Sequence, residues 1–145
     1  MSAKMTEEAI KELANTWYHL LDVHAPVTEF LPLLHPDVKM VFPEATLEGQ
    51  GAFSEWLAGV VRLFFDEHHI VKEVKAEFVS PDTANVKVVV NWQTKRWKPP
   101  AAKSEFLDCM AYQSWVVKAS PQTGKPLIAT YIVDRLVPQP GSAPL

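Results

Sequence analysis

The sequence predicts an α+β domain in which a curved antiparallel sheet wraps over N-terminal helices. Apolar residues recur at helical spacing over residues 6–23 and again over residues 52–66. After residue 70, alternating apolar and polar residues indicate a succession of long strands. Because 145 residues suit one domain and no repeat or linker interrupts them, we expect a single domain over residues 1–137. Residues 138–145 are proline-rich, and we expect a tail without packed structure there.

The first predicted helix covers residues 6–23. Thr6 can cap it, and Glu7 and Glu8 in the first turn oppose the positive end of the helix dipole. Pro26 ends the region. The helix presents one apolar stripe, formed by Ile10, Leu13, Ala14, Trp17, Leu20 and Leu21.

Short elements follow the first helix. Residues 27–35 are apolar but contain Pro32, so a brief helix or two turns is expected. A short strand over residues 38–42 stops at Pro43, and residues 46–48 can add another short strand.

A second helix then leads directly into a strand. Apolar residues at helical spacing predict a helix over residues 52–66, and alternation predicts a strand over residues 70–78. His68 and His69 stand at the joint between them. A helix leading into a strand, with two histidines at the joint, is a place where a pocket can form.

Three further strands are expected, over residues 85–97, 105–118 and 127–137. Residues 105–118 are apolar on both parities, which is typical of a central strand covered on both faces.

Composition argues against several classes of partner. The formal charge is −3 and the basic residues are scattered, which argues against nucleic acid. No apolar run approaches the roughly 20 residues that span a bilayer. The single cysteine, Cys109, allows no intrachain disulfide and fits a reducing cytoplasm, and its strand-like surroundings predict a buried, inert thiol.

Several short motifs occur in an order that resembles the nuclear transport factor 2-like superfamily, which includes SnoaL-like cyclases, ketosteroid isomerases and scytalone dehydratases. They are Trp17-Tyr18-His19-Leu20-Leu21-Asp22, Leu33-Leu34-His35-Pro36-Asp37-Val38, Leu47-Glu48-Gly49 followed by Phe53 and Trp56, His68-His69-Ile70-Val71, and Ala111-Tyr112-Gln113-Ser114-Trp115-Val116-Val117. The resemblance implies a cone-shaped α+β barrel with a deep pocket, often dimerising through the outer sheet face.

The resemblance also implies which chemistry to look for. Ketosteroid isomerases carry an Asp base before a proline in the first strand region, and here Phe42 precedes Pro43. The Asp-Arg-Asp set of small epoxide hydrolases is not evident, since Val88, Val90 and Trp92 occupy the expected inner parity. SnoaL-like cyclases and the dehydratases use a pocket His with an Asp, and usually a Tyr.

That last pattern has candidates here. Strand parity favours His68 over His69 as the inward histidine, because His68 shares parity with Ile70, unless a bulge shifts the register. Asp22 can orient it, with Asp108 and Asp134 as alternative carboxylates, and Tyr18 or Tyr112 can donate a hydrogen bond. We predict His68, Asp22 and Tyr18 as the catalytic set, with His68 as general acid and base.

Aromatic residues are expected to line the pocket and to suit a flat, apolar ligand, or else to fill the core. Those predicted at the ligand are Trp17, Phe42, Trp56, Trp92 and Tyr112. The five histidines show no zinc-site spacing, so we expect neither a metal nor another cofactor.

The sequence therefore favours a small-molecule pocket protein, homodimeric through its outer sheet face. If it is an enzyme, it is a cofactor-free isomerase, cyclase or dehydratase acting on an apolar or aromatic carbonyl compound. Two alternatives stay open: a non-catalytic module that binds a ligand or a partner protein, and the small subunit of a ring-hydroxylating oxygenase, which shares this fold.

Overall fold

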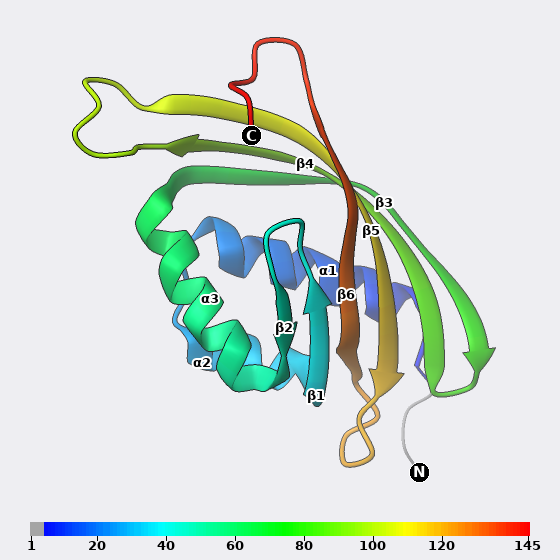
Figure 1. The fold of residues 1–145 in the computed structure, drawn as a ribbon. Coiled ribbons are helices and arrows are strands. Elements are labelled where there is room, and N and C mark those ends of the chain that lie inside the picture. The colour runs from blue at the N-terminus through cyan, green and yellow to red at the C-terminus, as the bar shows by residue number, and fades with distance from the viewer. Residues whose placement is uncertain (1–4) are drawn as a thin grey trace.

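The computed structural model describes residues 5–145 and has the predicted α+β architecture (Figure 1). Its helices are α1 (Glu7–Asp22), the short α2 (Val27–Phe30) and α3 (Gly49–Leu63), with a 3₁₀ turn at Leu31–Leu33. The six strands are β1 (Leu34–Val41), β2 (Thr46–Glu48), β3 (Phe64–Ser80), β4 (Thr83–Arg96), β5 (Glu105–Ala119) and β6 (Pro126–Pro138).

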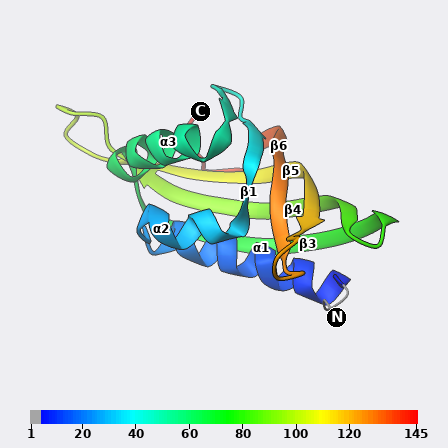
Figure 2. The same ribbon diagram turned by 90° about the horizontal axis from the view of Figure 1, so that it is seen from below.

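The strands form one curved, open sheet in the order β2-β1-β6-β5-β4-β3. Strands β3 to β6 are an antiparallel meander, as predicted, whereas β1 runs parallel to β6 and makes the sheet mixed. The helices lie on the concave side of the sheet, with α1 along the β3 end and α3 near β1 and β2 (Figures 1 and 2). The space between helices and sheet contains the core and the candidate site.

Helix α1 begins as the sequence indicates. The Thr6 hydroxyl accepts a hydrogen bond from the Ala9 amide at 3.1 Å, which satisfies one of the free N–H groups of the first turn. The predicted apolar stripe is buried at Ile10, Trp17 and Leu21. A second α1 residue, Glu7, accepts from the backbone N–H of Ala76 at 3.1 Å, and so fixes the helix to the edge strand β3.

The joint between α3 and β3 differs from the prediction. The helix ends at Leu63 and the strand begins at Phe64, because Phe64 and Phe65 already pair with the end of β4. Three irregularities interrupt the β3–β4 register: one between Phe65 and His68, one between Val71 and Glu73, and one at the far end between Phe78 and Ser80. Asp66, at the first of them, has a positive φ of 52°.

The core occupies the concave face of the sheet. Strand β5 is central and turns one parity inward. Between the two ends of the strand, every side chain on this parity is buried: Leu107, Cys109, Ala111, Gln113, Trp115 and Val117. Cys109 is a free, buried thiol, as predicted, and burial raises its pKa.

The C-terminal segment packs against the sheet, contrary to the expectation of an unpacked tail. Strand β6 ends opposite Cys109, so β5 continues beyond its partner. The tail supplies the missing donors: the Gln139 amide donates to the Asp108 carbonyl and the Ala143 amide to the Phe106 carbonyl, each at 2.7 Å.

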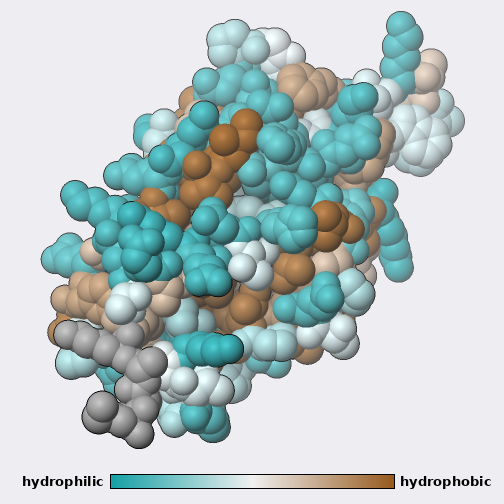
Figure 3. Space-filling view, turned by 180° about the vertical axis from the view of Figure 1, so that it is seen from behind, coloured by the Kyte–Doolittle hydropathy of each residue, from teal (hydrophilic) through white to brown (hydrophobic). Residues whose placement is uncertain are grey.

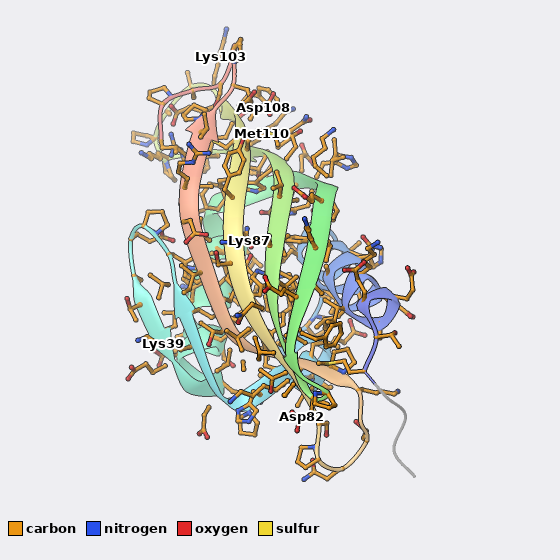
Figure 4. All side chains as sticks on the ribbon, turned by 90° about the vertical axis from the view of Figure 1, so that its right-hand side faces the viewer. Lys39, Asp82, Lys87, Lys103, Asp108 and Met110 are labelled. Carbon is orange, nitrogen blue, oxygen red and sulfur yellow. The ribbon has the colours of Figure 1, made fainter. Side chains whose placement is uncertain are left out.

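Within residues 5–145, no helix lies on the opposite, outer face of the sheet (Figure 4). Figure 4 looks toward it, with Lys87 near its middle and Asp108 and Met110 toward one end. The back of the molecule is mostly hydrophilic, with hydrophobic residues in narrow stripes (Figure 3). Within residues 5–145, no helix has the length and apolar character that crossing a membrane requires.

Candidate active site

A cavity of about 910 Å³ lies between α3, the C-terminal end of α1 and the concave face of strands β3 to β6. Its walls are largely aromatic and aliphatic. Phe42 and Trp56 stack face to face with ring centroids 4.3 Å apart, and Phe64 meets Trp92 edge to face at 5.1 Å. A cavity of this size and lining suits an apolar small molecule.

His69 is the histidine that lines this cavity, and it is hydrogen-bonded to Asp22. The Nδ1 of His69 lies 2.6 Å from Oδ1 of Asp22, and the His69 backbone N–H donates to Oδ2 of the same carboxylate at 3.1 Å. The His69 side chain is only 8% exposed. The two bonds fix the ring in both position and orientation.

The contact with Asp22 also determines the tautomer of His69. An ionised carboxylate can only accept hydrogen bonds, so Nδ1 carries the proton and donates it to Oδ1. In the neutral ring, Nε2 then has a free lone pair, and no residue in the described part of the chain hydrogen-bonds to it. The Tyr18 ring stacks on the imidazole at 5.0 Å and holds its plane. The arrangement can supply a base on a ring that lines an apolar cavity.

The prediction that His68 faces the cavity is wrong. His68 is exposed and lines instead a smaller hollow of about 380 Å³, which Asp22 and His69 also border. Before the bulge, the inward residues of β3 are His69, which pairs with Trp92, and Val71, which pairs with Val90; all four line the cavity or pack against the core. Beyond the bulge, the inward residue is Val74, which pairs with the buried Val88. The inserted residue at Lys72 reverses the inward parity along β3.

A second polar group faces the cavity from β5. Gln113 is 5% exposed, and its Oε1 lies 2.9 Å from the Tyr18 hydroxyl and 3.0 Å from the Trp115 indole nitrogen. Burial raises the pKa of Tyr18 well above its ordinary value, and the neighbouring Tyr131 raises it further. Burial likewise raises the pKa of Tyr131, against the lowering effect of hydrogen bonding with Tyr18 and its neighbours. Both phenols are therefore neutral donors at physiological pH.

A carboxylate also lines the cavity. The Glu67 side chain is 3% exposed, and it accepts from the Trp92 indole N–H at 3.3 Å and from His24 Nε2 at 3.0 Å. His24 comes from the turn that follows α1, where its φ is 52°. Two donors thus compensate a charge that would otherwise be costly to bury.

Of the aromatic residues predicted to contact a ligand, some line the cavity and others do not. Phe42, Trp56 and Trp92 line the cavity, and that they contact a ligand stays a prediction. Trp17 does not line it: it is 1% exposed and packs edge to face on Phe30 within the core.

Tyr112 does not line the cavity either. It lies on the outward parity of β5, beneath the guanidinium of Arg135 at 4.3 Å. Of the alternative carboxylates, Asp108 also lies on that parity and accepts from Asn91, while Asp134 is exposed at the rim of the cavity and accepts from Ser114 at 2.6 Å.

Sequence reasoning missed Gln113 and Glu67 as cavity residues and ranked His69 behind His68. Gln113 had a signal, because between Leu107 and Ala119 it is the single polar residue on an otherwise apolar parity of β5. His69 also had one, because Lys72 stood on the supposed apolar parity of β3 and indicated a bulge. Glu67 had none, since its place depends on how α3 meets β3.

No group of three or more His, Cys, Asp or Glu side chains that could hold a metal ion occurs within residues 5–145. The polar groups at the cavity suit proton transfer and hydrogen bonding.

No protein-family model matches the sequence, and no curated protein sequence does. Solved structures do match. A scytalone dehydratase-like protein from Novosphingobium aromaticivorans has 21% identity and a TM-score of 0.72, over 91% of this chain and 83% of that one. Hexachlorocyclohexane dehydrochlorinase LinA-type3 from Novosphingobium barchaimii has 16% identity and a TM-score of 0.75, over 95% and 92%.

A ketosteroid isomerase-like protein from Erwinia carotovora atroseptica has 16% identity and a TM-score of 0.69, over 86% of this chain and 92% of that one. These likenesses, all below 25% identity, establish the fold, which this chain shares with a dehydratase-like protein, a dehydrochlorinase and an isomerase-like protein.

Proposed function

We propose that this protein is a cofactor-free isomerase or lyase in which His69 acts as the general base on an apolar small molecule. The observation that supports this most is the Asp22–His69 pair, whose hydrogen bond occupies Nδ1 and leaves Nε2 without a partner among residues 5–145, on a ring that lines the cavity. The neighbours of similar fold include proteins named for a dehydratase and a dehydrochlorinase, both of which are elimination activities.

The proposed step needs no other reactant. Nε2 removes a proton from a carbon that neighbours an electron-withdrawing group, and the electrons of the broken C–H bond move toward that group. In an isomerisation, the imidazolium returns the proton at another carbon. In an elimination, the electrons form a double bond and expel a leaving group, and Asp22 stabilises the imidazolium meanwhile.

A single buried free cysteine is consistent with a reducing compartment, and we place the protein in the cytoplasm.

The test is proton exchange. Cyclic ketones of one to four rings are incubated with the protein in D₂O, and NMR follows replacement of their α-protons by deuterium. We expect the wild type to accelerate exchange for at least one ketone, and His69→Gln to slow it by about a hundredfold or more. His68→Gln is the matched control, because it changes the exposed neighbour, and it should exchange at the wild-type rate.

A panel in which no ketone exchanges faster with the wild type than with His69→Gln contradicts a catalytic role. Ligand-induced stabilisation without any exchange would favour a binding module instead.

A further inference from the structure

The buried amide of Gln113 has one end that is fixed by the protein and one end with a free N–H. Trp115 Nε1–H can only donate a hydrogen bond, so the Gln113 atom 3.0 Å from it must be the amide oxygen. The Tyr18 hydroxyl, 2.9 Å from the same oxygen, must then donate to it as well. Two donors on one oxygen exclude the flipped orientation of the amide.

The amide nitrogen of Gln113 is therefore the end left over. It carries two N–H donors. The hydroxyl of the neighbouring Tyr131 can accept from one of them, and no other residue that the structure describes accepts from the second. Gln113 lines the cavity, in a wall made largely of Val90, Ala111 and Val133, which offer no side-chain acceptor. An unpaired donor in an apolar wall is costly unless a ligand supplies the acceptor.

The base and this donor are positioned by one helix. Tyr18 and Asp22 are one turn apart on α1: Asp22 orients His69 through its carboxylate, and Tyr18 orients Gln113 through its hydroxyl. The Tyr18 ring also stacks on His69 at 5.0 Å, so the imidazole and the amide lie at the two ends of one tyrosine side chain. A small molecule in the cavity can touch both.

We propose that Gln113 binds an oxygen acceptor of the substrate, so that the site selects carbonyl compounds over hydrocarbons or alkyl halides of the same shape. This deepens the function proposed above and rests on it for the role of His69. When His69 removes an α-proton, negative charge moves to the carbonyl oxygen, and an N–H donor fixed in place before the reaction stabilises that charge. Gln113 is the binding residue, and Tyr18 is the positioning residue that holds its amide.

Binding of matched pairs tests the proposal. Each pair is a ketone and its deoxygenated hydrocarbon, such as 2-tetralone and tetralin, over one to four rings. Titration follows the quenching of tryptophan fluorescence, since Trp56 and Trp92 line the cavity. We expect the wild type to bind at least one ketone about tenfold more tightly than its hydrocarbon.

Gln113→Glu is the informative variant. Its carboxylate still accepts from Tyr18 and Trp115 but has no N–H, so it should bind the hydrocarbon normally and lose the preference for the ketone. Gln113→Leu is a second variant that removes the donor without adding charge. A panel in which no ketone is preferred by the wild type, including one in which nothing binds, overturns the proposal, as does a preference that persists in both variants.

The side-chain amide gives a direct readout. In ¹⁵N-labelled protein, the Gln113 amide resonances are identified by their absence from Gln113→Glu, and they should shift with the ketone more than with the hydrocarbon. Tyr18→Phe should move these resonances in the free protein, whereas unchanged resonances would contradict a positioning role for Tyr18. His69→Gln should keep the ketone preference, which separates this test from that of the proposed reaction.

Discussion

Asp22 holds both the ring and the backbone N–H of His69, and this double contact decides which ring nitrogen can act as a base. In Asp22→Asn, the side-chain amide can donate an N–H to Nδ1 of His69, whereas the carboxylate could only accept from it. The imidazole then favours the tautomer with its proton on Nε2. We expect α-proton exchange to fall by about a hundredfold or more, with ketone binding little changed.

The control for this variant is Asp108→Asn, which changes a carboxylate on the outward parity of β5. Both variants are measured by the same NMR exchange assay. If Asp22→Asn exchanged at the wild-type rate while His69→Gln did not, the orientation of His69 would have to come from its stacking with Tyr18 instead.

The buried phenols of Tyr18 and Tyr131 make stability depend on alkaline pH. Burial raises the pKa of both above the ordinary value of 10.0. At a pH between the pKa of a phenol in the unfolded chain and its higher pKa in the folded chain, the folded chain binds more protons. The free energy of unfolding therefore falls as pH rises. The stabilisation is complete below about pH 10 and is lost above it, by up to about 1.4 kcal/mol per pH unit for each phenol.

Urea unfolding at about pH 9 and about pH 11 measures this slope. Tyr131→Phe should make the fall with pH shallower, because it removes one of the two buried phenols. Tyr112→Phe is the control, since the third tyrosine lies on the outer face beneath Arg135. An equal slope in wild type and Tyr131→Phe would mean that other groups, such as lysines, dominate alkaline unfolding.

At the scale of elements, Gly49 starts α3 with a positive φ of 84°. A side chain there would meet no atom within 4 Å, so the cost of Gly49→Ala comes from the backbone alone and amounts to about 1–2 kcal/mol. Gly51, two residues later within the helix, is equally open but has no positive φ. Gly51→Ala should therefore stabilise the protein, by about 0.5–1 kcal/mol.

Urea denaturation of these two variants gives changes of opposite sign if this account holds. Destabilisation by Gly51→Ala would show that the first turn of α3 depends on the conformational freedom of that position as well.

The same scale explains what could be predicted from the sequence. Helix α1 has a cap, a dipole-compensating first turn and a clear apolar stripe, and each of these local signals agrees with the structure. The long strands were also evident from alternation. Parallel pairing of β1 with β6 was not predicted, because it joins segments far apart in the chain and leaves no local pattern.

The candidate site could be predicted only in part, because local patterns are visible in the sequence and long-range contacts are not. Asp22 and Tyr18 stand on a regular helix, and both lie at the site. The choice of histidine depended on counting residues along β3, and one extra residue at Lys72 reversed that count. Gln113 acquires its significance only from donors on α1 and β5, which the sequence does not place together.

At the scale of the whole molecule, the concave face of the sheet is occupied by helices and by the cavity, whereas no helix in the described part of the chain lies on the outer face (Figures 2 and 4). Apolar side chains on this face, including Met110, Val116 and Ile132, are half-buried within the single chain. Covering such side chains with a second copy would remove apolar surface from water. We therefore propose a homodimer through the outer sheet face.

Sedimentation equilibrium measures the mass in solution. We expect about twice the 16.3 kDa of one chain for the wild type, and a mass near that of one chain for Val116→Asp, which places a charge in the proposed interface. Val79→Asp is the control, because Val79 is 61% exposed at the far end of β3, and it should remain dimeric. Since Val116 does not line the cavity, Val116→Asp should also keep ketone binding. A wild type that sediments as one chain, or a Val79→Asp variant that dissociates as readily as Val116→Asp, would contradict this interface.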